Sequence, residues 1–288
     1  MAKKYVYSFG GKKAEGSAQM RNLLGGKGAG LAEMTRLGIP VPPGFTITTE
    51  ACLEYFKNKQ FPKGMFNEAV AALTRVEKIK KEKFGDPANP LLVSVRSGSR
   101  ASMPGMMDTV LNLGLNDQTV LGMIKKSNNE QFGYDAYRRF VAMFGTIVMG
   151  VKREHFDEAF TAALHTHRVS LDAMLPANAL KELVATFKKI VMKEAKRPFP
   201  DNPMEQLQMA IAAVFDSWFG ARAVTYRRLN NIPDTWGTSV SVVAMIFGNR
   251  GDDSGTGVLF TRNPNTGERR FFGEFLFNAQ GEDVVAGI

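Results

Sequence analysis

The spacing of apolar residues predicts helices and short strands in the first 116 residues. Leu31, Met34 and Leu37 recur at helical spacing after a glycine-rich segment, and Gly38 ends that helix. A second amphipathic helix is predicted over residues 66–84. Both patterns indicate helices with one apolar face turned toward a core.

Two short runs rich in β-branched residues predict strands in the same region. Residues 46–48 form the first run, with Thr49 as the N-cap of the next helix. Residues 91–95 form the second run, a buried strand that leads directly into Arg96. Residues 101–114 are rich in Met and Gly and are expected to form a loop.

The remaining chain changes character twice. Residues 117–204 are almost wholly helical in pattern, and one further helix is predicted over 204–229, with Gly220 near its middle. Strands are then predicted over residues 239–247, 257–261 and 271–277, with a hairpin turn at 262–268. The chain is therefore predicted to be α+β with an all-helical insert. Its closing strands would form a small open sheet, so we expect a piece of a longer protein.

Composition places the chain among soluble globular proteins. It has 288 residues, 44% hydrophobic and 23% charged, which is too apolar for a disordered chain. No apolar run is long enough to span a membrane, and no secretory signal follows Met1. The single cysteine, Cys52, excludes an intrachain disulfide and favours the cytoplasm.

The formal net charge of +9 is compatible with nucleic acid, anionic lipid or an anionic small substrate. The basic residues are spread along the chain, and none of them forms a basic tail. We therefore expect most of these charges to lie on solvated helix faces.

Lys27 lies in a Gly-Gly-Lys-Gly segment, residues 25–28, at a predicted helix start. Helix N-termini present free N–H groups that favour phosphate, and glycine lets the backbone approach an anion closely. The segment lacks the spacing and the hydroxyl residue of a Walker A loop. It is either one side of a phosphate site or a glycine turn before a surface helix.

Three further features have a functional and a structural interpretation. Arg96 follows a buried strand, where its guanidinium suits phosphate oxygens or forms a salt bridge that fixes the loop. The Met-rich residues 97–108 either wall an adenine pocket or pack in the core. Residues 254–257, Ser-Gly-Thr-Gly, either cover phosphates from the opposite side or form part of a hairpin.

The histidines predict no metal site. His165 and His167 are two residues apart, on different faces of a helix, and His155 is isolated from both. We expect all three on the surface and Cys52 buried, and the sequence has no Ser/His/Asp or Cys/His arrangement.

Several segments carry the pattern of a known family. Residues 21–28 (Arg-Asn-Leu-Leu-Gly-Gly-Lys-Gly), 42–46 (Pro-Pro-Gly-Phe-Thr) and 92–98 (Leu-Val-Ser-Val-Arg-Ser-Gly) resemble the N-terminal nucleotide-binding domain of the pyruvate, phosphate dikinase family. Phosphoenolpyruvate synthase and the glucan water dikinases share looser versions. The segments that look specific to the pyruvate, phosphate dikinase branch are 101–114, 255–258, 261–264 and 278–285. The resemblance covers nearly the whole chain and is weakest in the insert.

The resemblance implies an ATP-grasp fold, in which the nucleotide lies between two lobes. Residues 1–116 with 205–238 would form the first lobe and 117–204 the helical insert. Residues 239–288 would form part of an antiparallel second lobe that is cut short.

The resemblance also implies the site residues. Lys27 and Arg96 would contact the phosphates and act in catalysis. The other implied nucleotide contacts are Gly98, Met103, Gly105, Asp108, Thr256, Gly257, Gln280 and Glu282.

Members of the family convert ATP, phosphate and pyruvate to AMP, pyrophosphate and phosphoenolpyruvate, using Mg²⁺ and a swivelling domain that carries a phosphohistidine. None of the three histidines here lies in the family's Gly-Gly-x-Thr-Ser-His context. The phosphohistidine, the acidic metal ligands and the pyruvate-binding barrel are expected beyond residue 288. We therefore expect this chain alone to bind nucleotide weakly and not to turn over, and the full-length enzyme to be a homo-oligomer.

Two alternatives stay open at this point. A water-dikinase branch, similar to phosphoenolpyruvate synthase, would use water in place of phosphate, and the Met-Pro-Gly-Met-Met segment at 103–107 argues against it. A basic nucleic-acid-binding module would need clustered Lys and Arg interleaved with aromatic residues, which the sequence lacks. The expected partners are ATP, phosphate and the swivelling domain, with no nucleic acid and no membrane.

Overall fold

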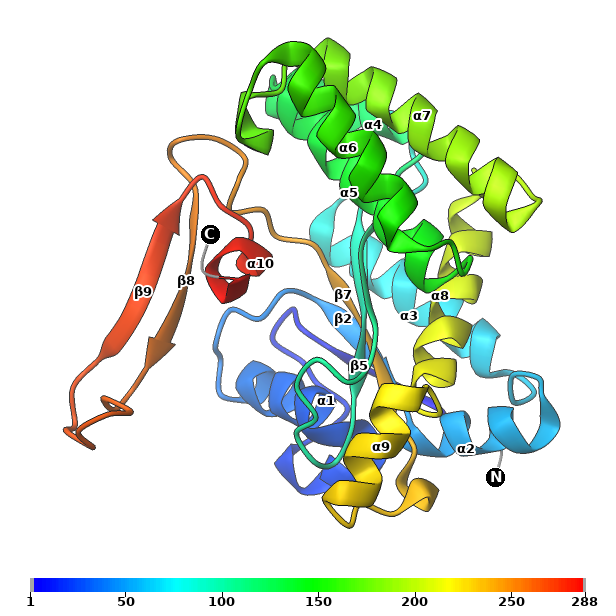
Figure 1. The fold of residues 1–288 in the computed structure, drawn as a ribbon. Coiled ribbons are helices and arrows are strands. Elements are labelled where there is room, and N and C mark those ends of the chain that lie inside the picture. The colour runs from blue at the N-terminus through cyan, green and yellow to red at the C-terminus, as the bar shows by residue number, and fades with distance from the viewer. Residues whose placement is uncertain (1–2, 287–288) are drawn as a thin grey trace.

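A five-stranded antiparallel sheet forms the centre of the computed structural model (Figure 1). The structure describes residues 3–286, apart from the side chains of Asp172, Glu282, Val285 and Ala286. The strand order is β1 (Val6–Phe9), β2 (Gly44–Ile47), β7 (Ser239–Ala244), β5 (Val93–Gly98) and β6 (Thr109–Leu113). A small parallel pair, β3 (Lys83–Phe84) and β4 (Pro90–Leu91), precedes β5.

The two faces of the sheet differ because side chains alternate along each strand. In β7, Val240 and Val242 belong to the hydrophobic core, whereas Ser239 and Ser241 lie on the opposite face. The core face packs against α3 (Met65–Lys80) and α8 (Pro203–Ser217). The opposite, polar face is partly covered by α1 (Arg21–Arg36).

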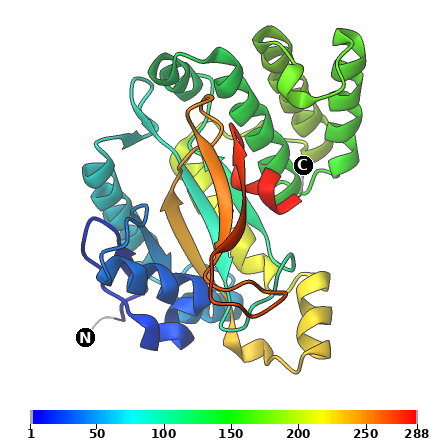
Figure 2. The same cartoon turned by 90° about the vertical axis from the view of Figure 1, so that its left-hand side faces the viewer.

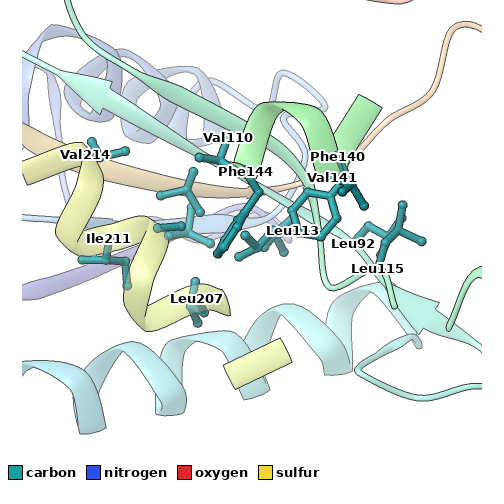
Figure 3. Close-up of a cluster of buried hydrophobic side chains, with 14 of the residues drawn as sticks. Leu92, Val110, Leu113, Leu115, Phe140, Val141, Phe144, Leu207, Ile211 and Val214 are labelled. Atoms are coloured by element: carbon teal, nitrogen blue, oxygen red, sulfur yellow. The ribbon is translucent and has the colours of Figure 1, made fainter. Parts of the chain in front are cut away.

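Residues 117–204 are helical, as predicted. They form α4 (Thr119–Ser127), α5 (Glu130–Ile147), α6 (Arg153–His167), the 3-10 turn η2 (Asp172–Met174) and α7 (Ala177–Ala195). Phe140 and Phe144 of α5 lie in one cluster with Leu207 and Ile211 of α8 (Figure 3). The helical insert therefore shares its core with the central sheet.

The predicted helix over 204–229 is two helices. α8 ends at Ser217 and α9 (Ala221–Leu229) begins after Gly220, whose extended backbone (φ −62°, ψ 148°) interrupts the helix. Gly220 therefore marks a break, and the prediction of one continuous helix was wrong.

Three other predictions need correction. The loop expected over 101–114 is shorter, because Thr109–Leu113 pairs with β5 as strand β6. The N-cap of α2 (Thr49–Asn58) is Thr48, whose hydroxyl accepts the N–H of Ala51. In α1, Leu37 is 70% exposed, and the buried face consists mainly of small residues such as Gly28 and Ala32.

A hairpin of β8 (Gly255–Phe260) and β9 (Phe272–Phe277) forms a separate sheet, which lies in front of the central sheet in Figure 2. The hairpin and its turn were predicted correctly. α10 (Gly281–Ala286) packs against both strands. β7 pairs within the five-stranded sheet, so residues 239–288 do not form one sheet. Short 3-10 turns, η1 (Ala18–Met20) and η3 (Asp234–Trp236), precede α1 and β7.

Candidate functional site

A kink in α1 joins this helix to the end of β5. Gly25 has φ 69° and ψ 172°, outside the helical region. A Cβ at this position would lie 2.0 Å from the carbonyl oxygen of Gly98. The next residue, Gly26, donates its N–H to the carbonyl of Ser99 at 2.9 Å. Only glycine permits this conformation at this distance, so the glycine-rich segment makes a close tertiary contact.

The start of β7 completes this junction. The Ser239 hydroxyl lies 2.6 Å from the Leu24 carbonyl oxygen and 2.7 Å from that of Gly98, and can donate to either. Thr238 accepts the N–H of Gly98 on its hydroxyl oxygen at 3.2 Å. Sequence reasoning missed Thr238 and Ser239. Their only signal is a pair of hydroxyl residues at the start of a predicted strand.

α1 lies close to the polar face of the sheet because Gly28 has no side chain. A Cβ at Gly28 would lie 2.7 Å from Cγ2 of Thr46, on β2. Thr46 in turn shares a hydrogen bond of 3.2 Å with Ser241 on β7. The row of hydroxyl side chains on this face is therefore packed against the helix that carries Lys27.

The structure brings Lys27 and Arg96 together. Burial lowers the pKa of the Lys27 ammonium, and the positive charge of Arg96 lowers it further. Gly98, two residues after Arg96, approaches Lys27 closely, since a Cβ at Gly98 would lie 3.6 Å from the Cβ of Lys27. Three predicted site residues therefore form one group with two adjacent cations.

Arg96 lies inside strand β5 rather than after it. Its register partners are Thr109 on β6 and Ser241 on β7. Its Nε donates to the Ser94 hydroxyl at 3.3 Å, and the residue is exposed. Ser94 and Arg96 alternate with Val93 and Val95, which belong to the core. The guanidinium therefore projects from the polar face of the sheet.

The Met-rich loop, which lies within residues 97–108, contacts α9 and the core. Met103 is buried among core residues, so at this position the segment packs in the core rather than lining an adenine pocket. Gly105 has φ 70° and open space around it. Asp108 pairs with Arg222 at 3.4 Å; burial raises the pKa of this carboxyl group, and Arg222 opposes that shift.

The remaining predicted residues belong to the hairpin sheet and α10. The Thr256 hydroxyl donates to the Ala279 carbonyl at 2.7 Å, and Gly257 lies beside it on β8. Gln280 is 6% exposed, and its Nε2 has no hydrogen-bond partner among the described residues. Glu282 lies in α10, and its side chain lies outside the described part of the structure. These residues form a second group, on a different sheet from Arg96.

A groove of about 250 Å³ lies where β7 leads into the hairpin. Ser241, the register partner of Arg96, precedes Met245 at the groove by four residues, or about 13 Å of strand. The ring of Phe247 packs edge-on against Phe132 of α5, with centroids 5.2 Å apart. The lining residues are Lys80, Glu82, Pro90, Leu92, Met123, Lys126, Ser127, Phe132, Met245, Ile246, Phe247, Arg250 and Ser254.

Among the side chains that the structure describes, no group of three or more His, Cys, Asp or Glu has the arrangement of a metal site. In the same part of the chain, no helix combines the length and apolar character that crossing a bilayer requires.

Comparison with known proteins identifies the family. The model of the AMP/ATP-binding domain of pyruvate phosphate dikinase matches residues 21–81 and 55–288. The chain thus falls in the class of AMP/ATP-binding domains. The pyruvate, phosphate dikinase of Clostridium symbiosum is 55% identical over 288 residues, and the Rhizobium meliloti enzyme is 53% identical over 286. The chain belongs to the pyruvate, phosphate dikinase family.

The relatives are much longer than this chain. The alignments cover 99% of the chain but 32% of both bacterial enzymes. The chloroplastic pyruvate, phosphate dikinase 1 of Arabidopsis thaliana is 52% identical over all of the chain and 30% of its own length. The chain therefore spans about a third of the curated relatives it matches.

Proposed function

We propose that this chain binds ATP with its phosphates at Lys27 and Arg96. The observation that supports the proposal is the junction at Gly25 and Gly98, which brings the segments that carry Lys27 and Arg96 together, so that each charge acts on the other. Each cation raises the electrostatic cost of the other, and phosphate oxygens between them would remove that cost. Arg offers a planar fork of donors and Lys a mobile point charge, a combination that suits a polyphosphate.

The adenine ring would occupy the groove beside Met245. Apolar side chains that include Leu92, Met123 and Phe132 line this groove, and Phe247 adds an aromatic ring to the lining. About 13 Å of strand separates Met245 at this groove from Ser241, the register partner of Arg96, and this length suits an extended nucleotide. The resemblance implied that Met103 contacts the nucleotide. We place the adenine ring in this groove instead, because Met103 is buried in the core.

The proposed architecture is an ATP-grasp fold, with the nucleotide between the polar sheet face and the hairpin. Thr256, Gly257, Gln280 and Glu282 would approach the nucleotide from the hairpin side. The unpartnered Nε2 of buried Gln280 supports this role, because a buried donor without a partner is costly unless a ligand satisfies it.

For the full-length protein we propose the reaction of the family. ATP is cleaved between its α- and β-phosphates, so that AMP leaves and the two terminal phosphoryl groups pass to a histidine on a swivelling domain. Phosphate accepts the outer phosphoryl group to give pyrophosphate, and pyruvate accepts the remaining one from the histidine to give phosphoenolpyruvate. Lys27 and Arg96 would stabilise the charge that develops on the transferring phosphates. Mg²⁺ would supply further charge neutralisation. The described residues contain no acidic trio to hold it, so no step is assigned to the ion. A cytoplasmic homo-oligomer is the proposed form.

A pair of titrations tests this function. The chain is titrated with ATP and Mg²⁺, and in parallel with a short DNA oligonucleotide, by isothermal calorimetry at equal ionic strength. The proposal expects saturable ATP binding and no comparable oligonucleotide binding. Oligonucleotide binding without ATP binding would overturn it in favour of a nucleic-acid module.

A further inference from the structure

A basic depression lies at the edge of the central sheet, away from the site described above. Its volume is about 590 Å³. It lies between the loop that follows β1 and one side chain each from α1 and α3. The lining residues are Ser8, Lys12, Lys13, Ala14, Glu15, Arg36 and Arg75.

The loop that presents Lys12 and Lys13 is tightly built. Gly10, Gly11 and Lys12 have consecutive positive φ values of 89°, 61° and 70°. A Cβ at Gly10 would lie 2.4 Å from the Cα of Pro43, so the loop packs directly on the segment before β2. A lysine in the left-handed region is uncommon and carries a conformational cost, which the surrounding packing must impose.

The side chain of Arg75, on α3, forms hydrogen bonds with the backbone of this loop. Its Nη2 donates to the carbonyl oxygens of Gly10 at 3.2 Å and Lys13 at 3.1 Å. The guanidinium of Arg75, which lines the depression, is therefore held by two hydrogen bonds. A fixed guanidinium loses little entropy when it binds an anion, because its position is set before the anion arrives.

The positive charges of the depression are not neutralised within the described chain. Lys12, Lys13, Arg36 and Arg75 form no ion pair with any side chain that the structure describes. The carboxylate on its rim, Glu15, already accepts from Lys4 at 2.6 Å and from the Ser8 N–H at 2.7 Å. Four cations and one carboxylate, which already pairs with Lys4, therefore surround the depression, and the cations exceed the carboxylate.

We propose that this depression is a second anion site, which binds a small, multiply charged phosphate such as pyrophosphate or tripolyphosphate. The residues that line it include no aromatic side chain for a base to stack on, which favours a polyphosphate over a nucleoside. Lys27 and Arg36 are nine residues apart on α1, or about 14 Å of helix, so the two anion sites are separate. This proposal does not depend on the proposed function.

The test uses sodium tripolyphosphate as the probe at low ionic strength, measured by calorimetry. An Arg96→Ala chain is the background, so that the site at Lys27 contributes little. In this background, Lys12→Ala with Lys13→Ala is expected to raise the dissociation constant at least about tenfold. The matched control, Lys57→Ala with Lys63→Ala, removes the same charge from two exposed lysines elsewhere and is expected to change it less than about twofold.

An NMR titration of the unaltered chain gives a second readout that needs no variant to fold. Tripolyphosphate is expected to shift the amide signals of residues 10–15 and the side-chain signals of Arg36 and Arg75. The proposal is overturned if the Arg96→Ala chain binds no tripolyphosphate, if both lysine pairs have equal effects, or if those signals do not move. If the unaltered chain binds tripolyphosphate but does not bind ATP, that result would count against the proposed function alone.

Discussion

The carbonyl oxygen of Gly98 occupies the space that a side chain on Gly25 would need. A Cβ at Gly25 would lie 2.0 Å from that oxygen, and Gly25 has a positive φ of 69°. This contact joins the kink in α1 to the end of β5. Lys27 follows the kink and Arg96 precedes Gly98, so the contact sets the relative position of the two cations on which the proposed function depends.

Gly25→Ala is therefore expected to damage both folding and binding. The methyl group is incompatible with the backbone conformation and with the Gly98 carbonyl, so we expect a loss of at least about 2 kcal/mol in the free energy of unfolding. ATP binding should weaken in parallel. Urea unfolding and calorimetry measure the two effects.

Gly30→Ala is the matched control. Gly30 lies in the same helix with open space around its Cα. Its replacement should stabilise the helix by up to about 1 kcal/mol, because alanine has the higher helix propensity. Equal stabilities for the two variants would contradict the role assigned to the Gly25–Gly98 contact.

Lys27 gives a pH prediction with a defined sign. Its pKa is below the ordinary 10.5 in the folded chain, because of burial and then of Arg96. Between the lowered pKa and 10.5 the unfolded chain binds more protons, so this group makes stability rise with pH in that window. Below the lowered pKa its unfavourable contribution is present in full.

Lys27→Met should therefore be no less stable than the original chain at pH 7 and should lack the alkaline rise. Urea unfolding from pH 7 to 10 measures this. In a second measurement, the ¹³C signal of reductively methylated Lys27 should titrate below those of the other lysines. In the Arg96→Ala chain its titration should move upward. A Lys27 signal that titrates with the other lysines would contradict the assigned environment.

Arg227 should be the most demanding cation in the chain to replace. It is 1% exposed, donates to Asp234 at 2.8 and 2.6 Å from Nε and Nη2, and donates to the Trp218 carbonyl from Nη1. Its guanidinium lies 4.1 Å from the Trp218 ring centroid. Arg227→Lys keeps the charge but loses the planar set of N–H donors. We therefore expect the free energy of unfolding to fall by about 2–4 kcal/mol. The exposed neighbour provides the control: Arg228→Lys should change stability by less than about 0.5 kcal/mol in urea unfolding.

The chain alone is expected to form no AMP from ATP, phosphate and pyruvate, because none of its histidines lies in the family's phosphohistidine context. Chromatographic analysis of overnight incubations measures this. Detectable AMP would contradict the expectation.

Much of the fold follows from local pattern. A β-branched run gave β5, strand-like segments and a predicted hairpin turn gave β7 and the β8–β9 hairpin, and the helical period gave the insert. The prediction from Leu31, Met34 and Leu37 was wrong, because it assumed that the large apolar side chains of this helix are the buried ones. α1 instead packs through small residues such as Gly28, which allow a closer approach to the sheet. Size of side chain is visible in sequence, but the distance between two elements is not.

The candidate site was predictable only where it rests on single residues. Lys27 carries a charge between two glycines, and Arg96 carries a charge after a run of buried β-strand residues, and both are local signals. Ser239 contributes through contacts with Leu24 and Gly98, more than 140 residues away. No local pattern encodes such a contact. The groove beside Met245 was missed for the same reason, because strand, insert and linker each supply part of its wall.

The most direct test of the central claim is the affinity of the chain for ATP with Mg²⁺ after Arg96→Ala, measured by calorimetry beside Arg228→Ala. Arg228 is exposed on α9 and is not one of the proposed nucleotide contacts, and its replacement removes the same charge. The account predicts that Arg96→Ala raises the dissociation constant at least about tenfold, while Arg228→Ala leaves it within about twofold. Equal affinity of the Arg96→Ala chain and the original chain would contradict the account.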